Sequence, residues 1–200
     1  MDIERLNKQV DFCREIDKEK NIGRQTYLSD GKRKENDAEH AWHMAVMALV
    51  LSEYANEKID LLKTISMLLI HDLVEIDAGD TYCYDEEAKK SQQAREQAGA
   101  ERLFSMLPKE QAQKFYDLWR EFEEVKTPEA KFARTLDCFQ PMMLNVASGG
   151  KSWMEHSVKL SQLIHRNEHT PKGSKTLWQY ALDNFIMPNV ENGKIKNPKE

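Results

Sequence analysis

The residues best suited to chemistry lie at the end of the most apolar stretch of the sequence. His71 and Asp72 are adjacent there, and Glu75 follows on the same side of a helix, because residues three and four apart share a face. Charged side chains are costly to bury, so those kept in such a place usually pair with one another or bind a metal. The spacing therefore indicates a functional site.

Two residues elsewhere in the chain could complete this site. His40 lies in a predicted helix that begins at Asn36, and Asp137 is the only acid in the apolar stretch 132–144. Together with the His-Asp pair, they would supply two imidazoles and two carboxylates.

The elements that must position these residues are predicted to be helices. Apolar side chains recur at three and four residues along most of the chain, and neither an alternating strand nor an internal repeat is convincing. Helices are expected over about residues 3–21, 36–56, 60–76, 86–107, 108–122, 127–149, 152–166 and 177–186, with loops at 24–35 and 79–85. The expected fold is all-α, one compact bundle of seven or eight helices over residues 1–191, followed by a polar tail at 192–200.

Capping residues mark the starts of several of these helices. Asn36 is followed three residues later by Glu39, as in a capping box, and Ser152 begins a second box of the same kind. Asp60 and Thr127 are expected to cap the central helix and the helix that carries the distant acid.

The composition excludes several classes of partner. A formal charge of -5 argues against a nucleic-acid surface, because phosphate backbones are bound by clustered Lys and Arg. No apolar run approaches the roughly 20 residues that span a bilayer, and the N-terminus lacks the apolar core of a signal peptide. Cys13, Cys83 and Cys138 show no C-x-x-C spacing, which suggests a reducing cytosol. We therefore expect a cytoplasmic protein that binds neither a membrane nor a nucleic acid.

Three motifs around the candidate residues resemble those of a known family. They are residues 37–43 (DAEHAWH), 71–82 (HDLVEIDAGDTY) and 136–141 (LDCFQP). In this order they are similar to the HD-domain metal-dependent phosphohydrolases, in particular the branch that contains the HD-domain 5'-deoxynucleotidases. The resemblance covers roughly residues 24–145, which would form the metal-site core.

The resemblance implies one metal held by His40, His71, Asp72 and Asp137. Mixed imidazole and carboxylate ligands suit a divalent transition metal (Mn, Co, Fe, Ni or Zn) better than Mg or Ca. Family members with two metals carry further histidines between the His-Asp pair and the last Asp, and this chain has none there. We therefore expect a single metal.

The resemblance also implies roles for residues that do not bind the metal. Glu75 corresponds to the family's proton-transfer residue, Asp80 to an acid in the pocket, and Arg24 to the arginine that holds the phosphate. The family's next position is a Trp that crowds the sugar. In this chain that position is Gln25, so the preference for deoxynucleotides is expected to be weaker.

Four polar residues nearby are open to two interpretations. Arg33, in the basic run 32–34, is a further candidate for substrate binding, although such runs are more often solvated loops. His43 could face the metal, but a neighbouring histidine already fills that role. Arg134 could reach the phosphate or pair with a surface acid, and Asp77 could line the pocket or be solvated at a helix end.

We expect a metal-dependent hydrolase that removes phosphate from (deoxy)nucleoside 5'-monophosphates, with a small nucleotide as its partner. An HD-type enzyme that cleaves a phosphodiester or pyrophosphate bond of another nucleotide is the first alternative. A non-catalytic helical interaction protein with a structural metal is the second, although such a site does not require Glu75, Arg24 and Asp80. The sequence leaves the oligomeric state open, a homodimer included.

Overall fold

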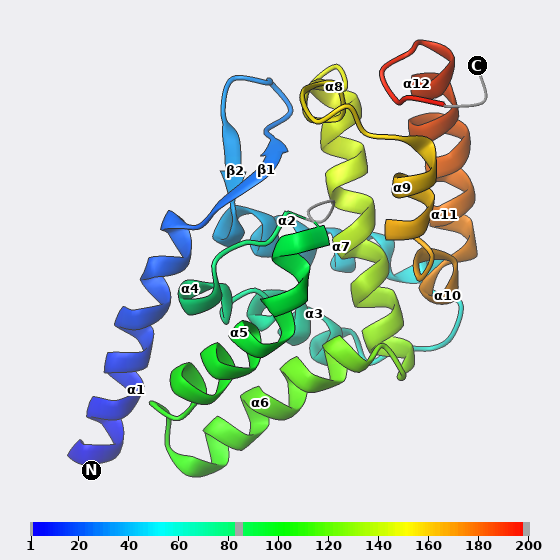
Figure 1. The fold of residues 1–200 in the computed structure, drawn as a ribbon. Coiled ribbons are helices and arrows are strands. Elements are labelled where there is room, and N and C mark those ends of the chain that lie inside the picture. The colour runs from blue at the N-terminus through cyan, green and yellow to red at the C-terminus, as the bar shows by residue number, and fades with distance from the viewer. Residues whose placement is uncertain (1, 83–85, 198–200) are drawn as a thin grey trace.

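The computed structural model describes residues 2–82 and 86–197, in which helices predominate (Figure 1). The α-helices are α1 Ile3–Glu15, α2 Asp37–Leu51, α3 Leu61–Ile70, α4 Glu75–Ala78, α5 Glu86–Phe104, α6 Lys109–Glu124, α7 Pro128–Ala147, α8 Lys151–Glu155, α9 Leu160–Arg166, α10 Thr170–Gly173, α11 Lys175–Ala181 and α12 Met187–Glu191. The other elements are η1 Ile16–Asn21, η2 Ser52–Tyr54 and η3 Leu182–Ile186, with strands β1 Gly23–Tyr27 and β2 Lys34–Asn36. The expected all-α fold class is confirmed. None of the helices in these residues is long and apolar enough to cross a membrane.

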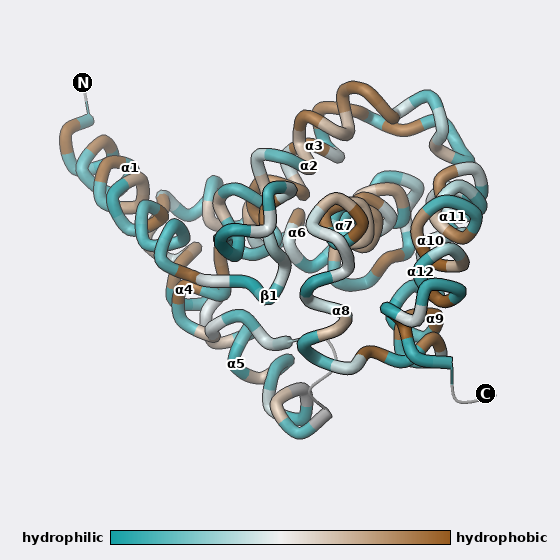
Figure 2. Tube along the Cα trace, turned by 90° about the horizontal axis from the view of Figure 1, so that it is seen from above, coloured by the Kyte–Doolittle hydropathy of each residue, from teal (hydrophilic) through white to brown (hydrophobic). Residues whose placement is uncertain are grey.

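Helix α7 passes through the middle of the molecule, and Figure 2 shows it end-on with other helices around it. Phe132, Leu136 and Phe139 of α7 are buried in a hydrophobic cluster with residues of α2, α3 and α11. A second cluster joins α1, α5 and α6 to the end of α3. Asp137 therefore stands on an element whose position is fixed by packing on several sides.

Helices α2, α3 and α7 start where the capping residues predict. The Asn36 side chain accepts a hydrogen bond from the N–H of Glu39, and the Glu39 carboxylate accepts one from the N–H of Asn36. Asp60 and Thr127 likewise accept hydrogen bonds from first-turn amides of α3 and α7.

The central helix is shorter than expected, because α3 ends at Ile70 and α4 begins only at Glu75. Between them the N–H groups of Leu73 and Glu75 bond carbonyls three residues back, at 3.3 and 2.8 Å, in a tightened turn. The His71-Asp72 pair lies in this turn, so its side chains leave the end of a buried helix instead of its side.

The segment 24–35, expected to be a loop, instead forms most of an antiparallel hairpin of β1 and β2. The N–H of Leu28 bonds the carbonyl of Arg33 at 2.9 Å, and Gly31 turns the chain with a φ of 67° that favours glycine. The hairpin packs against α7 and α8, and this contact carries Arg24 to the site.

The helix expected over 152–166 is two helices, α8 and α9, and Ser152 does not cap it. Helix α8 starts at Lys151 after Gly150, whose φ is 79°, and Ser157, with a φ of 50°, lies in the turn before α9. This division gives α9 an independent position beside α7.

Candidate metal centre and active site

The four proposed metal ligands come together from three helical segments. His40 is on α2, the His71-Asp72 pair follows α3, and Asp137 is on α7. His71 Nε2 lies 3.1 Å from Asp72 Oδ1 and 3.9 Å from Asp137 Oδ1, and His40 Nε2 lies 3.3 Å from the same Asp137 oxygen. Donor atoms of His40, His71 and Asp72 all lie within 4.8 Å of one another, a group that could hold a metal ion.

The hydrogen bonds behind the two histidines orient them in a way that suits metal ligands. His71 Nδ1 donates to the Leu68 carbonyl at 3.0 Å, and His40 Nδ1 donates to Gln140 Oε1 at 3.0 Å. The Gln140 amide is itself oriented, because its nitrogen donates to Glu35 Oε2 at 2.8 Å. With Nδ1 protonated, the tautomer that this network favours leaves each Nε2 with a lone pair.

These lone pairs face carboxylate oxygens, which fits a cation between them. Within residues 2–82 and 86–197, His71 Nε2 is buried and makes no hydrogen bond, although Asp72 Oδ1 is 3.1 Å away. Two electron-rich groups held at such distances repel one another unless a proton or a metal lies between them. The donor set therefore fits a divalent metal with mixed nitrogen and oxygen ligands.

The protonation states around the site agree with this assignment. Burial lowers the pKa of His40 to about 4, so its imidazole is neutral at pH 7. Burial raises the pKa of Asp137, but its contact with His40 and the nearby guanidinium groups of Arg166 and Arg134 hold it well below the ordinary value. Burial also lowers the pKa of His71, but Asp72 raises it overall, so a metal competes with a proton there.

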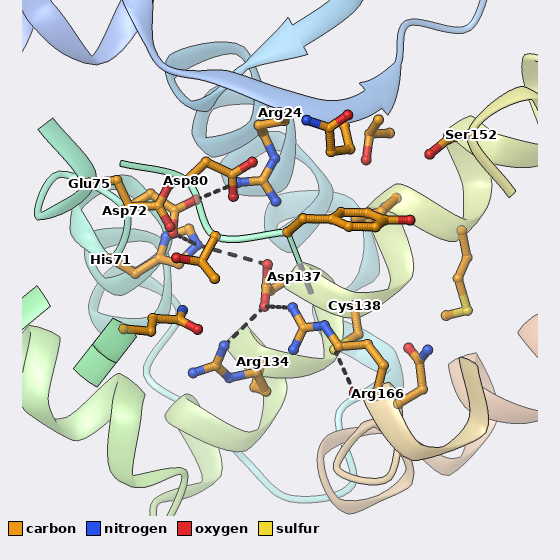
Figure 3. A pocket seen from close by; sticks show the side chains of 18 of the residues that line it. Arg24, His71, Asp72, Glu75, Asp80, Arg134, Asp137, Cys138, Ser152 and Arg166 are labelled. Carbon is orange, nitrogen blue, oxygen red and sulfur yellow. Dashed lines mark hydrogen bonds and ion pairs between the residues drawn. The ribbon is translucent and has the colours of Figure 1, made fainter. Parts of the chain in front are cut away.

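A cavity of about 240 Å³ opens beside the proposed metal site (Figure 3). Its walls include seven of the nine residues expected to bind the metal or the substrate or to act in catalysis: Arg24, Gln25, His71, Asp72, Glu75, Asp80 and Asp137. His40 lies behind them with no exposed surface.

Glu75 and Asp80 enter this cavity from the two ends of the short helix α4 and its following turn. Glu75 is buried, and its Oε2 has no hydrogen-bond partner among the residues that the structure describes. Burial, and then the charges of Asp72 and Asp37, raise the pKa of Glu75 well above its ordinary value. Gly79 precedes Asp80 with a φ of 73°, a conformation that turns the chain back toward the site.

Arg24 reaches the site from β1 and is almost surrounded by acids. Its Nη1 donates to Asp72 Oδ2 at 2.9 Å and to Asp37 Oδ1 at 3.1 Å, and its Nε lies 3.5 Å from Glu35 Oε1. Gln25 lines the cavity beside it, and the Gln25 side-chain oxygen accepts a hydrogen bond from a lysine of β2.

The structure does not bring Arg33 into the cavity. Its guanidinium pairs with both carboxylate oxygens of Glu39 at the surface, one residue before the buried His40. This bidentate pair fixes the side chain away from the cavity, and Arg33 is therefore left out of the site.

The structure shows the contacts of two residues whose role the sequence left undecided, Arg134 and Asp77. Arg134 makes one of the two contacts considered for it, an ion pair with the acid Glu123 at 3.1 Å, and it also contacts Asp137 at 3.2 Å. Asp77 pairs with Arg102 on α5, as suits a solvated helix end.

Four residues at the site had no predicted role: Glu35, Asp37, Gln140 and Arg166. Asp37 and Gln140 stand inside the quoted motifs and Glu35 lies two residues before the first, so their positions could have suggested a part in supporting the site. Arg166, 3.3 Å from Asp137, lies outside every motif and could not have been found from the spacing.

Replacing Gln140 is expected to weaken metal binding. Gln140→Leu keeps the side-chain volume but removes the acceptor for His40 Nδ1 and leaves Glu35 without its donor, so metal affinity should fall roughly 10- to 100-fold. Isothermal titration of the metal-free protein measures this, with Gln113→Leu on the exposed side of α6 as the control. An unchanged affinity would remove Gln140 from the support of the site.

Comparisons with known proteins agree with this geometry. A family model described as HD domain matches residues 16–178. The 5'-deoxynucleotidase HDDC2 of Xenopus laevis is 35% identical over 106 residues, 53% of this chain and 51% of the relative. HDDC2 of Dictyostelium discoideum is 27% identical over 167 residues, 80% of this chain and 87% of the relative. The match thus spans about half the length of the first of these relatives.

A solved structure is similar over nearly the whole chain. The crystal structure of a protein described as a predicted metal-dependent phosphohydrolase, from Magnetospirillum magnetotacticum MS-1, is 43% identical with a TM-score of 0.91. The match covers 96% of this chain and 95% of that one.

Proposed function

The chain belongs to the HD domain family, and from this premise we propose that it is a metal-dependent hydrolase that removes the phosphate from nucleoside 5'-monophosphates. The observation that carries the proposal is the convergence of two oriented imidazoles and two carboxylates on one side of a cavity that also contains Glu75 and Arg24. The relatives named as 5'-deoxynucleotidases support the choice of substrate.

His40, His71, Asp72 and Asp137 would hold one divalent transition metal, chosen among Mn, Co, Fe, Ni and Zn. A metal bound there would polarise the phosphoryl group and lower the pKa of a water molecule. A cytosolic setting is part of the same proposal and is supported by the free thiols of Cys13 and Cys138.

Glu75 is proposed to move the proton that hydrolysis requires. Water attacks the phosphorus, the bond from phosphorus to the 5'-oxygen breaks, and that oxygen leaves with the electron pair and takes up one proton. A raised pKa favours the protonated form of the carboxyl group, which can donate this proton. Its unpartnered Oε2 supports this role, because a buried carboxyl kept only for structure would normally be hydrogen-bonded.

Arg24 and Asp80 are proposed to hold the two ends of the substrate's reacting bond. Arg24 has five N–H donors, and those not used by Asp37 and Asp72 can bind phosphate oxygens and stabilise the charge that develops on them. Asp80 lines the same cavity and would orient the sugar or the leaving oxygen.

The experiment that tests this function is a phosphate-release screen with the metal-loaded protein. Ribo- and deoxynucleoside 5'-monophosphates are expected to yield inorganic phosphate and nucleoside, and a phosphodiester and a nucleoside triphosphate should remain intact. Cleavage of the diester or the triphosphate, with the monophosphates untouched, would show that the cavity serves another bond. A structural metal site predicts no turnover of any of them.

Gln25 is expected to leave discrimination between ribose and deoxyribose weak. A glutamine leaves more space than the family's Trp, and its amide could hydrogen-bond a 2'-hydroxyl, so the two sugars should differ in kcat/KM by less than about tenfold. Gln25→Trp should raise the deoxy preference by about tenfold or more. Matched ribo- and deoxynucleoside monophosphates measure this, with Gln25→Ala separating added bulk from loss of the amide. A strong native preference that Gln25→Trp leaves unchanged would place the selection elsewhere.

A further inference from the structure

Two arginines that the proposed function does not use converge on the outer oxygen of Asp137. Arg134 Nη1 lies 3.2 Å and Arg166 Nη2 lies 3.3 Å from Asp137 Oδ2. The other oxygen, Oδ1, faces the two imidazoles. Both guanidinium groups are therefore separated from the metal position by a single carboxylate, and Figure 3 shows them on the side of Asp137 away from Arg24.

The side chains of the two arginines differ in exposure. Arg134 also pairs with Glu123 at 3.1 Å and stacks on the ring of Phe122 at 4.2 Å, and its side chain is 17% exposed. The Arg166 side chain is 32% exposed and lines the cavity. Both arginines line the cavity, and Arg166 presents the more exposed side chain to it.

The backbone that carries Arg166 is anchored. Arg166 is the last residue of α9, in which Leu163 is fully buried in the main hydrophobic cluster. The next residue, Asn167, is buried and donates from its side chain to the Leu163 carbonyl at 2.8 Å. The fold therefore directs Arg166 into the cavity from the C-terminal part of the chain, beyond the motifs of residues 24–145.

The excess of acidic side chains in the cavity indicates that Arg24 alone does not balance the charge of a bound phosphate. Arg24 already contacts three carboxylates, those of Glu35, Asp37 and Asp72, so its charge is largely compensated. Carboxylates outnumber arginines among the residues that line the cavity. A phosphate dianion that enters beside these acids is repelled unless further donors face it.

We propose that Arg166 is a second phosphate-binding residue, which exchanges Asp137 Oδ2 for an oxygen of the substrate phosphate. The inference rests on the proposed function and adds to it an oxyanion position opposite Arg24. A metal held by Asp137 would draw negative charge away from Oδ2 and weaken the contact of this oxygen with Arg166. Arg134 remains on Oδ2, so Asp137 keeps its orientation while Arg166 turns to the phosphate. The guanidinium fork suits the remaining phosphate oxygens.

The test measures the binding of inorganic phosphate to the manganese-loaded protein by isothermal titration. Arg166→Gln is expected to raise the Kd for phosphate about tenfold or more, the range expected for loss of a charge-assisted hydrogen bond. Arg166→Lys keeps the charge but loses the two-pronged guanidinium group, so its Kd for phosphate should lie between those of the native protein and Arg166→Gln. Arg120→Gln on α6, which removes an exposed arginine paired with Asp117 on its own helix, is the matched control and should leave the Kd unchanged.

The same variants are titrated with manganese to separate phosphate binding from support of Asp137. The proposal expects Arg166→Gln to keep its manganese affinity within about threefold, because Arg134 still holds Asp137. A phosphate Kd unchanged at full metal occupancy would overturn the proposal, as would a loss confined to manganese affinity. Because phosphate binding needs no turnover, a protein inert toward nucleoside monophosphates would reject the proposed function and still report on Arg166.

Discussion

Asp137→Ala is expected to abolish metal binding and to lower turnover by roughly three orders of magnitude or more, while the protein remains helical. Asp137 Oδ1 lies within 4 Å of both imidazole nitrogens, so its loss removes the one carboxylate that faces His40 and His71 from α7. A metal contributes several kcal/mol to such a reaction, and each 1.36 kcal/mol is a factor of ten in rate. The metal content of the purified variant measures metal binding, phosphate release measures turnover, and circular dichroism measures the helical content.

Two further variants make this result interpretable. Asp137→Asn keeps the volume of the side chain and separates loss of the charge from loss of packing in α7. Asp117→Ala, on the exposed side of α6, removes an acid far from the cavity and should change neither metal content nor turnover. Full metal occupancy with undiminished activity in Asp137→Ala would exclude Asp137 from the site.

Glu75→Gln is expected to retain the metal and to lose roughly two to four orders of magnitude in turnover, the usual range for a proton-transfer residue. Glu75 is not among the proposed ligands, and its free Oε2 and raised pKa suit it to hold a proton that glutamine cannot deliver. Asp77→Asn, two residues along α4 and paired with Arg102, is the matched control. Near-normal turnover of Glu75→Gln with confirmed metal occupancy would remove Glu75 from the mechanism.

The sequence was most informative where a local signal and a burial constraint agreed. Asn36, Asp60 and Thr127 cap helices because their side chains satisfy amides of their own first turns, a short-range effect that the sequence shows directly. The acid Asp137 was evident because a charge in an apolar stretch needs a partner, and the structure places it beside imidazoles.

The features that the sequence did not reveal depend on contacts between distant segments. The apolar pattern runs unbroken from α3 into α4, so nothing local marks the tightened turn that presents the His-Asp pair. The β1–β2 hairpin has strands of five and three residues, too short for an alternating pattern to be distinctive. The sequence also could not show that Arg33 lies outside the cavity and Arg166 inside it. Arg33 pairs with Glu39 at the surface, and Arg166 contacts Asp137 from a separate helix.

The central claim is that one bound metal makes this cavity a phosphomonoesterase. The most direct test titrates the metal-free protein with manganese or cobalt and follows the phosphate released from a deoxynucleoside 5'-monophosphate. We predict that the rate rises in proportion to added metal, reaches a plateau at one equivalent per chain and returns to background after chelation. A protein that releases phosphate equally well without metal, or releases none at any metal loading, would contradict the account.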